Sequence, residues 1–211
     1  SEAARRELSF DKKDQSWPYR MLGCAALERQ DDSKAIEFYQ NSLRISPNDI
    51  ESWLGLGEAY FSVGRLESSS KVFDHVMEVD PENWYAQYLN AVVQAELGDY
   101  QDSVTKLRAL HYSKKDELCV ITSLYETLIS KVGYEITSGF IGRSLDTSLE
   151  AFEFIFLAHS MNESSQKLWK SLSDLLKLFL HVQKHISKIP FQKINAMIEK
   201  TVLSNSESHV V

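Results

Sequence analysis

One spacing recurs along the first half of the 211-residue chain: residues that match one another lie 34 positions apart. The matched positions hold a Leu-Gly pair, a small residue, an aromatic residue and a proline. They are Leu22, Gly23, Ala35, Tyr39 and Pro47 in the first copy, and Leu56, Gly57, Ser69, Phe73 and Pro81 in the second. A third copy continues with Ala91, Gly98, Ser103 and Leu107, but it has Lys115 in place of the proline. A fixed period of this length is typical of arrays in which each unit buries its apolar face against its neighbours.

The second copy carries the fullest pattern, W-x2-L-G-x2-Y followed by a small residue, an aromatic residue and proline. Its members are Trp53, Leu56, Gly57, Tyr60, Gly64, Ser69, Phe73 and Pro81. This pattern resembles the tetratricopeptide (TPR) repeat, in which each unit is a pair of antiparallel helices. The resemblance predicts an all-α fold, a TPR-type α-α superhelix that forms a right-handed solenoid. Because the sequence has no initiating Met, we expect it to be a fragment of a longer array.

The period also predicts the organisation of the chain. Three TPR repeats are expected at residues 16–49, 50–83 and 84–117, with Tyr19 in the tryptophan position of the first. Residues 1–15 are interpreted as the end of a preceding repeat or a linker, and residues 204–211 as a disordered tail. Residues 118–203 are predicted to form degenerate TPR-like helical repeats, because apolar residues continue there at spacings of three and four.

Two stretches in this degenerate region invite a second interpretation. The run AFEFIFLA at 151–158 alternates like a strand, but its neighbours extend the helical spacing on both sides, so a helix is predicted. A heptad from Leu168 to Ile189 would suit a coiled coil. A second apolar stripe, formed by Trp169, Leu176 and Leu180, instead favours a helix buried between two neighbours.

The glycines of SWLGLGEAYFSVGR, residues 52–65, could suggest a phosphate-binding loop. The dinucleotide motif G-x-G-x-x-G fails because Tyr60 stands at its third glycine and no strand precedes it. The repeat supplies another reason for the glycines: Gly23 and Gly57 are small because the second helix crosses there, and a larger side chain would overpack. Gly64 and Gly98 are predicted to be left-handed caps at the ends of helices. Pro47 and Pro81 are predicted to stop the second helices.

Composition restricts the function further. Lysine and arginine total 23 against 30 acidic residues, a net charge of −7, which argues against generic nucleic-acid binding. Residues 164–203 nevertheless carry a net charge of +5, either as solvated helix faces or as a site for an acidic partner or RNA, so direct RNA contact stays open. Neither a signal peptide nor an apolar run of membrane-spanning length is found, and Cys24 and Cys119 are isolated, which favours a soluble, intracellular protein.

No constellation of residues indicates catalysis. His181 and His185 are spaced to share one helix face, but HVQKH lacks the glutamate and third ligand of a zinc site. We found no nucleophile with an adjacent base and no acid/base pair. The predictions are therefore that the chain is not an enzyme and has no catalytic residue, cofactor, metal or small-molecule substrate.

The candidate site is the concave surface that first helices line in TPR proteins. The resemblance maps that surface onto Trp17, Arg20, Glu28, Glu51, Leu54, Glu58, Phe61, Tyr85 and Tyr88, together with Cys24, Leu27, Ser62, Val92, Ala95 and Glu96. Aromatic anchors among scattered acids suit protein recognition, although several of these residues could simply pack under the next repeat. A chaperone-type carboxylate clamp is not expected, because Cys24 takes the place of its asparagine, Glu58 adds a negative charge, and Tyr88 and Val92 supply no cation.

The non-consensus stretches SWPYR, DIESW and WYAQY and the helix around Trp169 resemble the large TPR subunit of the fungal superkiller complex. That resemblance implies a cytoplasmic scaffold that gathers an RNA helicase and WD-repeat propeller subunits and assists the exosome in degrading mRNA from the 3′ end. Two alternatives stay open: a TPR scaffold of another assembly, such as a corepressor or ubiquitin-ligase complex, and a regulatory TPR segment of a larger enzyme.

Overall fold

The computed structural model describes residues 16–114, 117–161 and 166–183. All regular structure in these ranges is helical, and the prediction of an all-α TPR-type fold is confirmed. The chain forms two units, Ser1–Asp99 and Tyr100–Val211. Residues 1–15, the tail at 204–211 and the helix expected after Pro190 lie outside the described residues.

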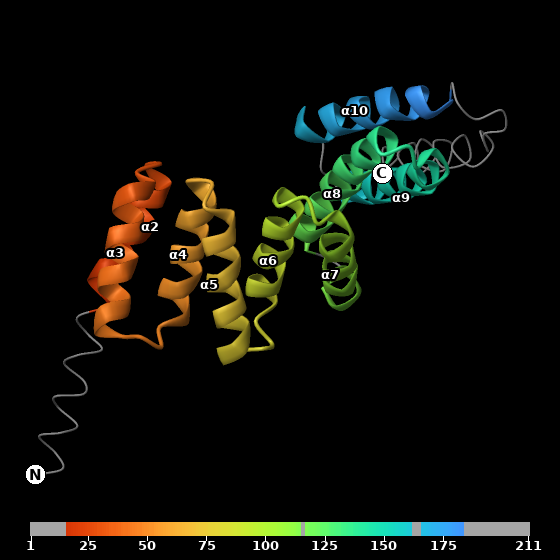
Figure 1. Cartoon of the computed structure of the whole chain (residues 1–211). Coiled ribbons are helices and arrows are strands. Elements are labelled where there is room, and N and C mark those ends of the chain that lie inside the picture. The colour runs from red at the N-terminus through yellow and green to blue at the C-terminus, as the bar shows by residue number, and fades with distance from the viewer. Residues whose placement is uncertain (1–15, 115–116, 162–165, 184–211) are drawn as a thin grey trace, which may run out of the picture. The chain divides into compact units, whose positions relative to one another are not determined.

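The first unit is built from helices of 12 to 14 residues joined by short turns. The helices are α2 (Trp17–Glu28), α3 (Asp32–Ile45), α4 (Ile50–Ser62), α5 (Leu66–Val79) and α6 (Trp84–Glu96). Each helix packs on the next, so that α3 lies against both α2 and α4 and α5 lies against both α4 and α6 (Figure 1). The alternate helices α2, α4 and α6 also contact one another in succession, which places them on one side of the unit.

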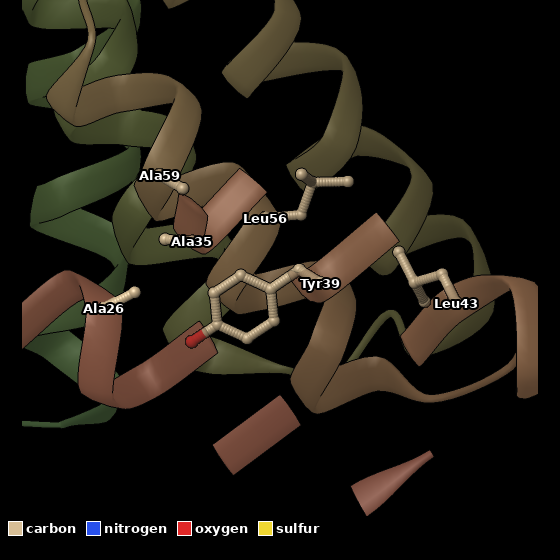
Figure 2. Close-up of a cluster of buried hydrophobic side chains, with 6 residues drawn as sticks. All are labelled: Ala26, Ala35, Tyr39, Leu43, Leu56 and Ala59. Carbon is tan, nitrogen blue, oxygen red and sulfur yellow. The ribbon is translucent and has the colours of Figure 1, made fainter. Parts of the chain in front are cut away.

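One cluster in the core of this unit consists of a buried aromatic residue surrounded by small and aliphatic side chains. Figure 2 shows Tyr39 of α3 among these buried neighbours, which are Ala26, Ala35, Leu43, Leu56 and Ala59. Burial raises the pKa of the Tyr39 hydroxyl well above its usual range, and the hydrogen bond to Cys24 Sγ at 3.3 Å contributes to the same shift. The phenol therefore stays neutral and serves as a packing group.

The glycines of the first unit have the two roles that the sequence predicted. A Cβ atom on Gly23 would lie 2.8 Å from the Tyr39 ring, and one on Gly57 would collide with the Phe73 ring, so both positions must be small. Gly64 and Gly98 have φ angles of 74° and 89°, in the left-handed region that favours glycine after a helix. The residue 34 positions before Gly64 is Gln30, which adopts a φ of 59° without being glycine.

The second unit contains longer helices. After α7 (Tyr100–Ser113) come α8 (Leu118–Thr137) and α9 (Ile141–Ser160), of 20 residues each, and then α10 (Gln166–Gln183). The run AFEFIFLA is part of α9, so the helical interpretation of it is correct. The third expected repeat, 84–117, is divided between the units, because α6 belongs to the first and α7 to the second.

Helix α10 is amphipathic, and one of its two predicted stripes is buried. Leu168, Leu175, Phe179 and Val182 are at most 4% exposed, and the helix packs on α8 and α9. The second stripe is exposed instead: Trp169, Leu176 and Leu180 have 54%, 41% and 56% of their surface accessible. The expectation of a helix buried on two faces is therefore wrong for the described part of α10. In the described ranges, no helix is both long enough and apolar enough to cross a membrane.

Candidate partner-binding surface

The predicted surface residues all lie on the three alternate helices of the first unit. Trp17, Arg20 and Glu28 are on α2, Glu51, Leu54, Glu58 and Phe61 are on α4, and Tyr85 and Tyr88 are on α6. We call this side, formed by α2, α4 and α6, the first-helix face. Trp17, Glu28, Glu51 and Tyr85 are exposed, whereas the other five predicted residues are partly buried.

Arg20 connects α2 to the start of α4. Its Nη1 donates to Asp49 Oδ1 at 3.0 Å and lies 2.7 Å from Glu51 Oε2. Arg20 and Asp49 are only 28% and 14% exposed, whereas the Glu51 side chain is 71% exposed. The guanidinium is thus neutralised by its neighbours, and its first role in this geometry is to join two helices.

Asp49 also belongs to a polar network that the sequence interpretation missed. Ser52 Oγ lies 2.7 Å from Asp49 Oδ2 and 2.8 Å from Ser42 Oγ, and Ser42 Oγ donates to the backbone oxygen of Ser16 at 3.1 Å. Ser42 and Ser52 are fully buried. Between α5 and α6, Asn90 Nδ2 similarly donates to Asp74 Oδ1 at 3.0 Å. The repeat pattern consists of the spacing of apolar and small residues. Short polar side chains such as these have no regular spacing that would predict their contacts.

A second polar constellation of the first-helix face joins α4 to α6. The Tyr85 hydroxyl donates to Glu58 Oε1 at 3.0 Å, and the Tyr85 and Tyr88 rings stack at a centroid distance of 6.0 Å with an interplanar angle of 26°. Trp84 adds an edge contact to Tyr85 at 5.7 Å. A carboxylate and two aromatic faces therefore lie together, and both kinds of group attract cations.

Most residues predicted to pack between helices are buried or partly buried. Leu56, Gly57, Phe73 and Gly23 are buried, and Trp53 and Tyr60 pack against the Tyr39 cluster. Trp53 Nε1 donates to the Pro47 oxygen at 2.8 Å, and Gln87, which stands 34 positions later, donates to the Pro81 oxygen at 2.7 Å. Both prolines lie in the exposed turns that follow α3 and α5.

Leu22 is the exception among the predicted packing residues, because it is 48% exposed. Its counterpart Leu56 on α4 is 4% exposed and lies in the cluster with Leu43 of the preceding helix α3. Helix α2 has no such preceding neighbour among the described residues. The prediction that Leu22 packs between helices is therefore wrong for the described part of the chain.

In the described ranges, no group of three or more His, Cys, Asp or Glu side chains could hold a metal ion. His181 is an exposed residue of α10, and His185 lies outside the described residues. Cys24 is exposed, and burial raises the pKa of the Cys119 thiol, with the nearby Glu117 contributing.

Comparison with known proteins supports the assignment of the fold. Residues 26–92 match the family model described as tetratricopeptide repeat. The fold is shared with the solved structure of YrrB, described as a TPR protein with an unusual peptide-binding site: the TM-score is 0.54 at 15% identity, over 85% of this chain and 97% of that one. The chain therefore has a fold of the tetratricopeptide-repeat type, and its residues 26–92 are similar to that family.

Two curated relatives are similar to this chain over most of its length. The chain is 32% identical to Superkiller protein 3 of Saccharomyces cerevisiae over 207 residues, and this alignment covers 98% of this chain and 14% of the relative. It is 30% identical over 190 residues to Superkiller protein 3 of Schizosaccharomyces pombe, covering 90% of this chain and 14% of that relative. The chain thus spans about one seventh of the length of these relatives.

Proposed function

We propose that the chain is a segment of a non-enzymatic, cytoplasmic scaffold that brings an RNA helicase and WD-repeat propeller subunits together for exosome-dependent decay of mRNA from the 3′ end. The observation that carries the proposal is the similarity to Superkiller protein 3 over 98% of this chain. A second Superkiller protein 3, from another yeast, is similar over 90% of it.

The geometry of the first unit supplies the mechanism of such a segment. The alternate helices are joined by the contacts of Arg20 with Asp49 and of Glu58 with Tyr85, and α5 is joined to α6 by the contact of Asn90 with Asp74. The side chains of the first-helix face are therefore held in fixed relative positions. A preorganised surface loses less conformational entropy when a partner binds. Rigid repeat units that present an extended surface are suited to collecting several partners.

A pull-down from cells tests the proposal. The full-length parent protein is compared with a form that lacks residues 16–203, and the captured proteins are identified by mass spectrometry. We expect the wild-type parent to recover helicase, propeller and exosome subunits, and the deletion to lose at least one of them. Recovery of an unrelated set of proteins, such as corepressor or ubiquitin-ligase subunits, would contradict the proposed assembly and leave the fold unaffected.

A further inference from the structure

The charge of the first-helix face is one-sided. Its three helices, α2, α4 and α6, contain the acidic residues Glu28, Glu51, Glu58 and Glu96, and Arg20 is their one basic residue. Arg20 is already paired with Asp49 and Glu51, at 3.0 and 2.7 Å. The face therefore offers negative charge without an uncompensated cation of its own.

Glu58 is the least exposed of these four acidic residues. Its side chain is partly buried, accepts the Tyr85 hydroxyl at 3.0 Å, and makes no ion pair within the described part of the chain. Tyr85 and Tyr88 present stacked rings beside it. A guanidinium or ammonium group placed here would meet a carboxylate and aromatic faces together, and partial burial strengthens both interactions relative to open water.

We propose that the Glu58, Tyr85 and Tyr88 cluster is the anchor point for a basic segment of a partner protein, with an arginine or lysine held at Glu58 and apolar side chains beside it against Phe61 and Leu54. Phe61 and Leu54 are partly buried on the same helix as Glu58, so the cation site continues into an apolar surface. This inference rests on the proposed function as a scaffold, and it specifies the chemistry of one docking segment. Arginine is favoured over lysine because its planar group both stacks on an aromatic ring and pairs with a carboxylate.

Selection from a random library of 12-residue peptides displayed on phage tests the inference with the 211-residue chain as bait. We expect the retained peptides to be enriched in arginine or lysine next to apolar residues, and their binding to weaken as salt is raised. Synthetic versions of the best binders should bind the Glu58→Gln variant about tenfold more weakly, as the loss of a charge-assisted contact implies. Glu58→Gln keeps a side-chain oxygen that can accept the Tyr85 hydroxyl, so the loss reports on charge.

Glu37→Gln is the matched control, because Glu37 is an exposed glutamate on α3, outside the first-helix face. It should bind the same peptides with unchanged affinity, and both variants should keep the wild-type circular-dichroism melting curve. Recovery of no binders, of neutral or acidic peptides, or of peptides that bind Glu58→Gln normally would overturn the inference. Those results would leave the proposed assembly standing if the parent protein still captured helicase and propeller subunits. Basic peptides together with capture of an unrelated set would support the anchor and contradict the assembly.

Discussion

The ring of Tyr39 on α3 occupies the space that a side chain at Gly55 on α4 would need. A Cβ atom built on Gly55 collides with the ring and hydroxyl of Tyr39, and one on Gly23 of α2 would meet the same ring at 2.8 Å. A single aromatic side chain is thus held between glycines of two successive helix pairs. The two glycines allow close approach on both sides of the ring, which explains why helical positions carry residues of low helix propensity.

Gly55→Ala should therefore destabilise the first unit, although alanine is the better helix former. Tyr39 is 2% exposed and its hydroxyl is hydrogen-bonded to Cys24 Sγ, so its ring cannot move toward solvent. Overpacking costs about 1–3 kcal/mol and the helical gain is about 1 kcal/mol, so we expect a net loss of up to about 2 kcal/mol in the free energy of unfolding. Chemical denaturation followed by circular dichroism measures it.

Gly133→Ala is the matched control for that experiment. Gly133 also lies inside a helix, α8, but a Cβ atom there would meet nothing within 4 Å. Alanine should raise the free energy of unfolding by about 0.5–1 kcal/mol at this position. If both substitutions stabilised the protein, the close approach of Tyr39 and Gly55 would be refuted.

Gln30 gives a prediction of the opposite sign. It adopts a φ of 59° at the position where the next helix pair has Gly64, with a φ of 74°. The left-handed conformation costs a residue with a Cβ atom roughly 1–2 kcal/mol, whereas glycine adopts it freely. Gln30→Gly should raise the free energy of unfolding by about 0.5–1 kcal/mol after the entropy of the unfolded glycine is counted. Thermal unfolding monitored by circular dichroism would show this as a higher midpoint.

The reciprocal substitution Gly64→Gln completes the comparison. A Cβ atom at Gly64 would meet nothing within 4 Å, so only the backbone conformation opposes it. It should lower the free energy of unfolding by about 1–2 kcal/mol. Equal midpoints for wild type, Gln30→Gly and Gly64→Gln would show that neither position is strained by a side chain.

The sequence predicted the features that depend on the spacing of apolar and small residues. The period of 34 located the crossing at Gly57 and Phe73, the caps at Gly64 and Gly98 and the turns at Pro47 and Pro81. These features follow from local geometry that repeats along the chain. Gln30 shows the limit of prediction from residue type. Its position in the period corresponds to a left-handed cap, but glutamine is not a residue that predicts one.

The candidate surface was predictable in part. The resemblance assigned Arg20, Glu58 and Tyr85 to one face, but it could not show that Arg20 pairs with Asp49 or that Tyr85 bonds to Glu58. Such contacts join side chains 27 to 29 residues apart, and their rotamers depend on how neighbouring helices pack. The prediction that Leu22 is buried was wrong for the same reason, because burial at its position depends on a preceding helix.

Trp53 and Trp17 differ in burial, so comparing their substitutions measures how much packing contributes to stability. Trp53 packs against the Tyr39 cluster, donates to the Pro47 oxygen at 2.8 Å and contacts the His75 ring edge-on at 4.7 Å, whereas Trp17 is 52% exposed. Trp53→Ala should cost about 3 kcal/mol of unfolding free energy, and Trp17→Ala less than about 0.5 kcal/mol. Urea titration followed by circular dichroism distinguishes them. Equal losses for the two variants would be incompatible with the packing described for α4.

Asp49 and Glu51 share a cation but differ in burial, so removing them should have different effects. Asp49 is 14% exposed and has both Arg20 and Ser52 as hydrogen-bond partners, whereas Glu51 is 71% exposed and contacts Arg20 at 2.7 Å. Asp49→Ala removes one of two acceptors from the buried Ser52 hydroxyl, which keeps Ser42, and one from the partly buried guanidinium, which keeps only the exposed Glu51. This loss should cost about 1–3 kcal/mol. Glu51→Ala removes one partner from a water-accessible ion pair and should cost less than about 1 kcal/mol.

Combining each substitution with Arg20→Ala tests whether the difference arises from the polar network. In a double-mutant cycle, the coupling energy between Arg20 and Asp49 should exceed that between Arg20 and Glu51, because a less exposed pair is screened less by water. Raising the salt concentration should reduce the Glu51 coupling more than the Asp49 coupling for the same reason. Urea unfolding of the single and double variants at low and high salt supplies all the required free energies. A larger coupling for Glu51 would show that Arg20 serves the exposed charge, and that the junction of α2 with α4 depends on apolar packing alone.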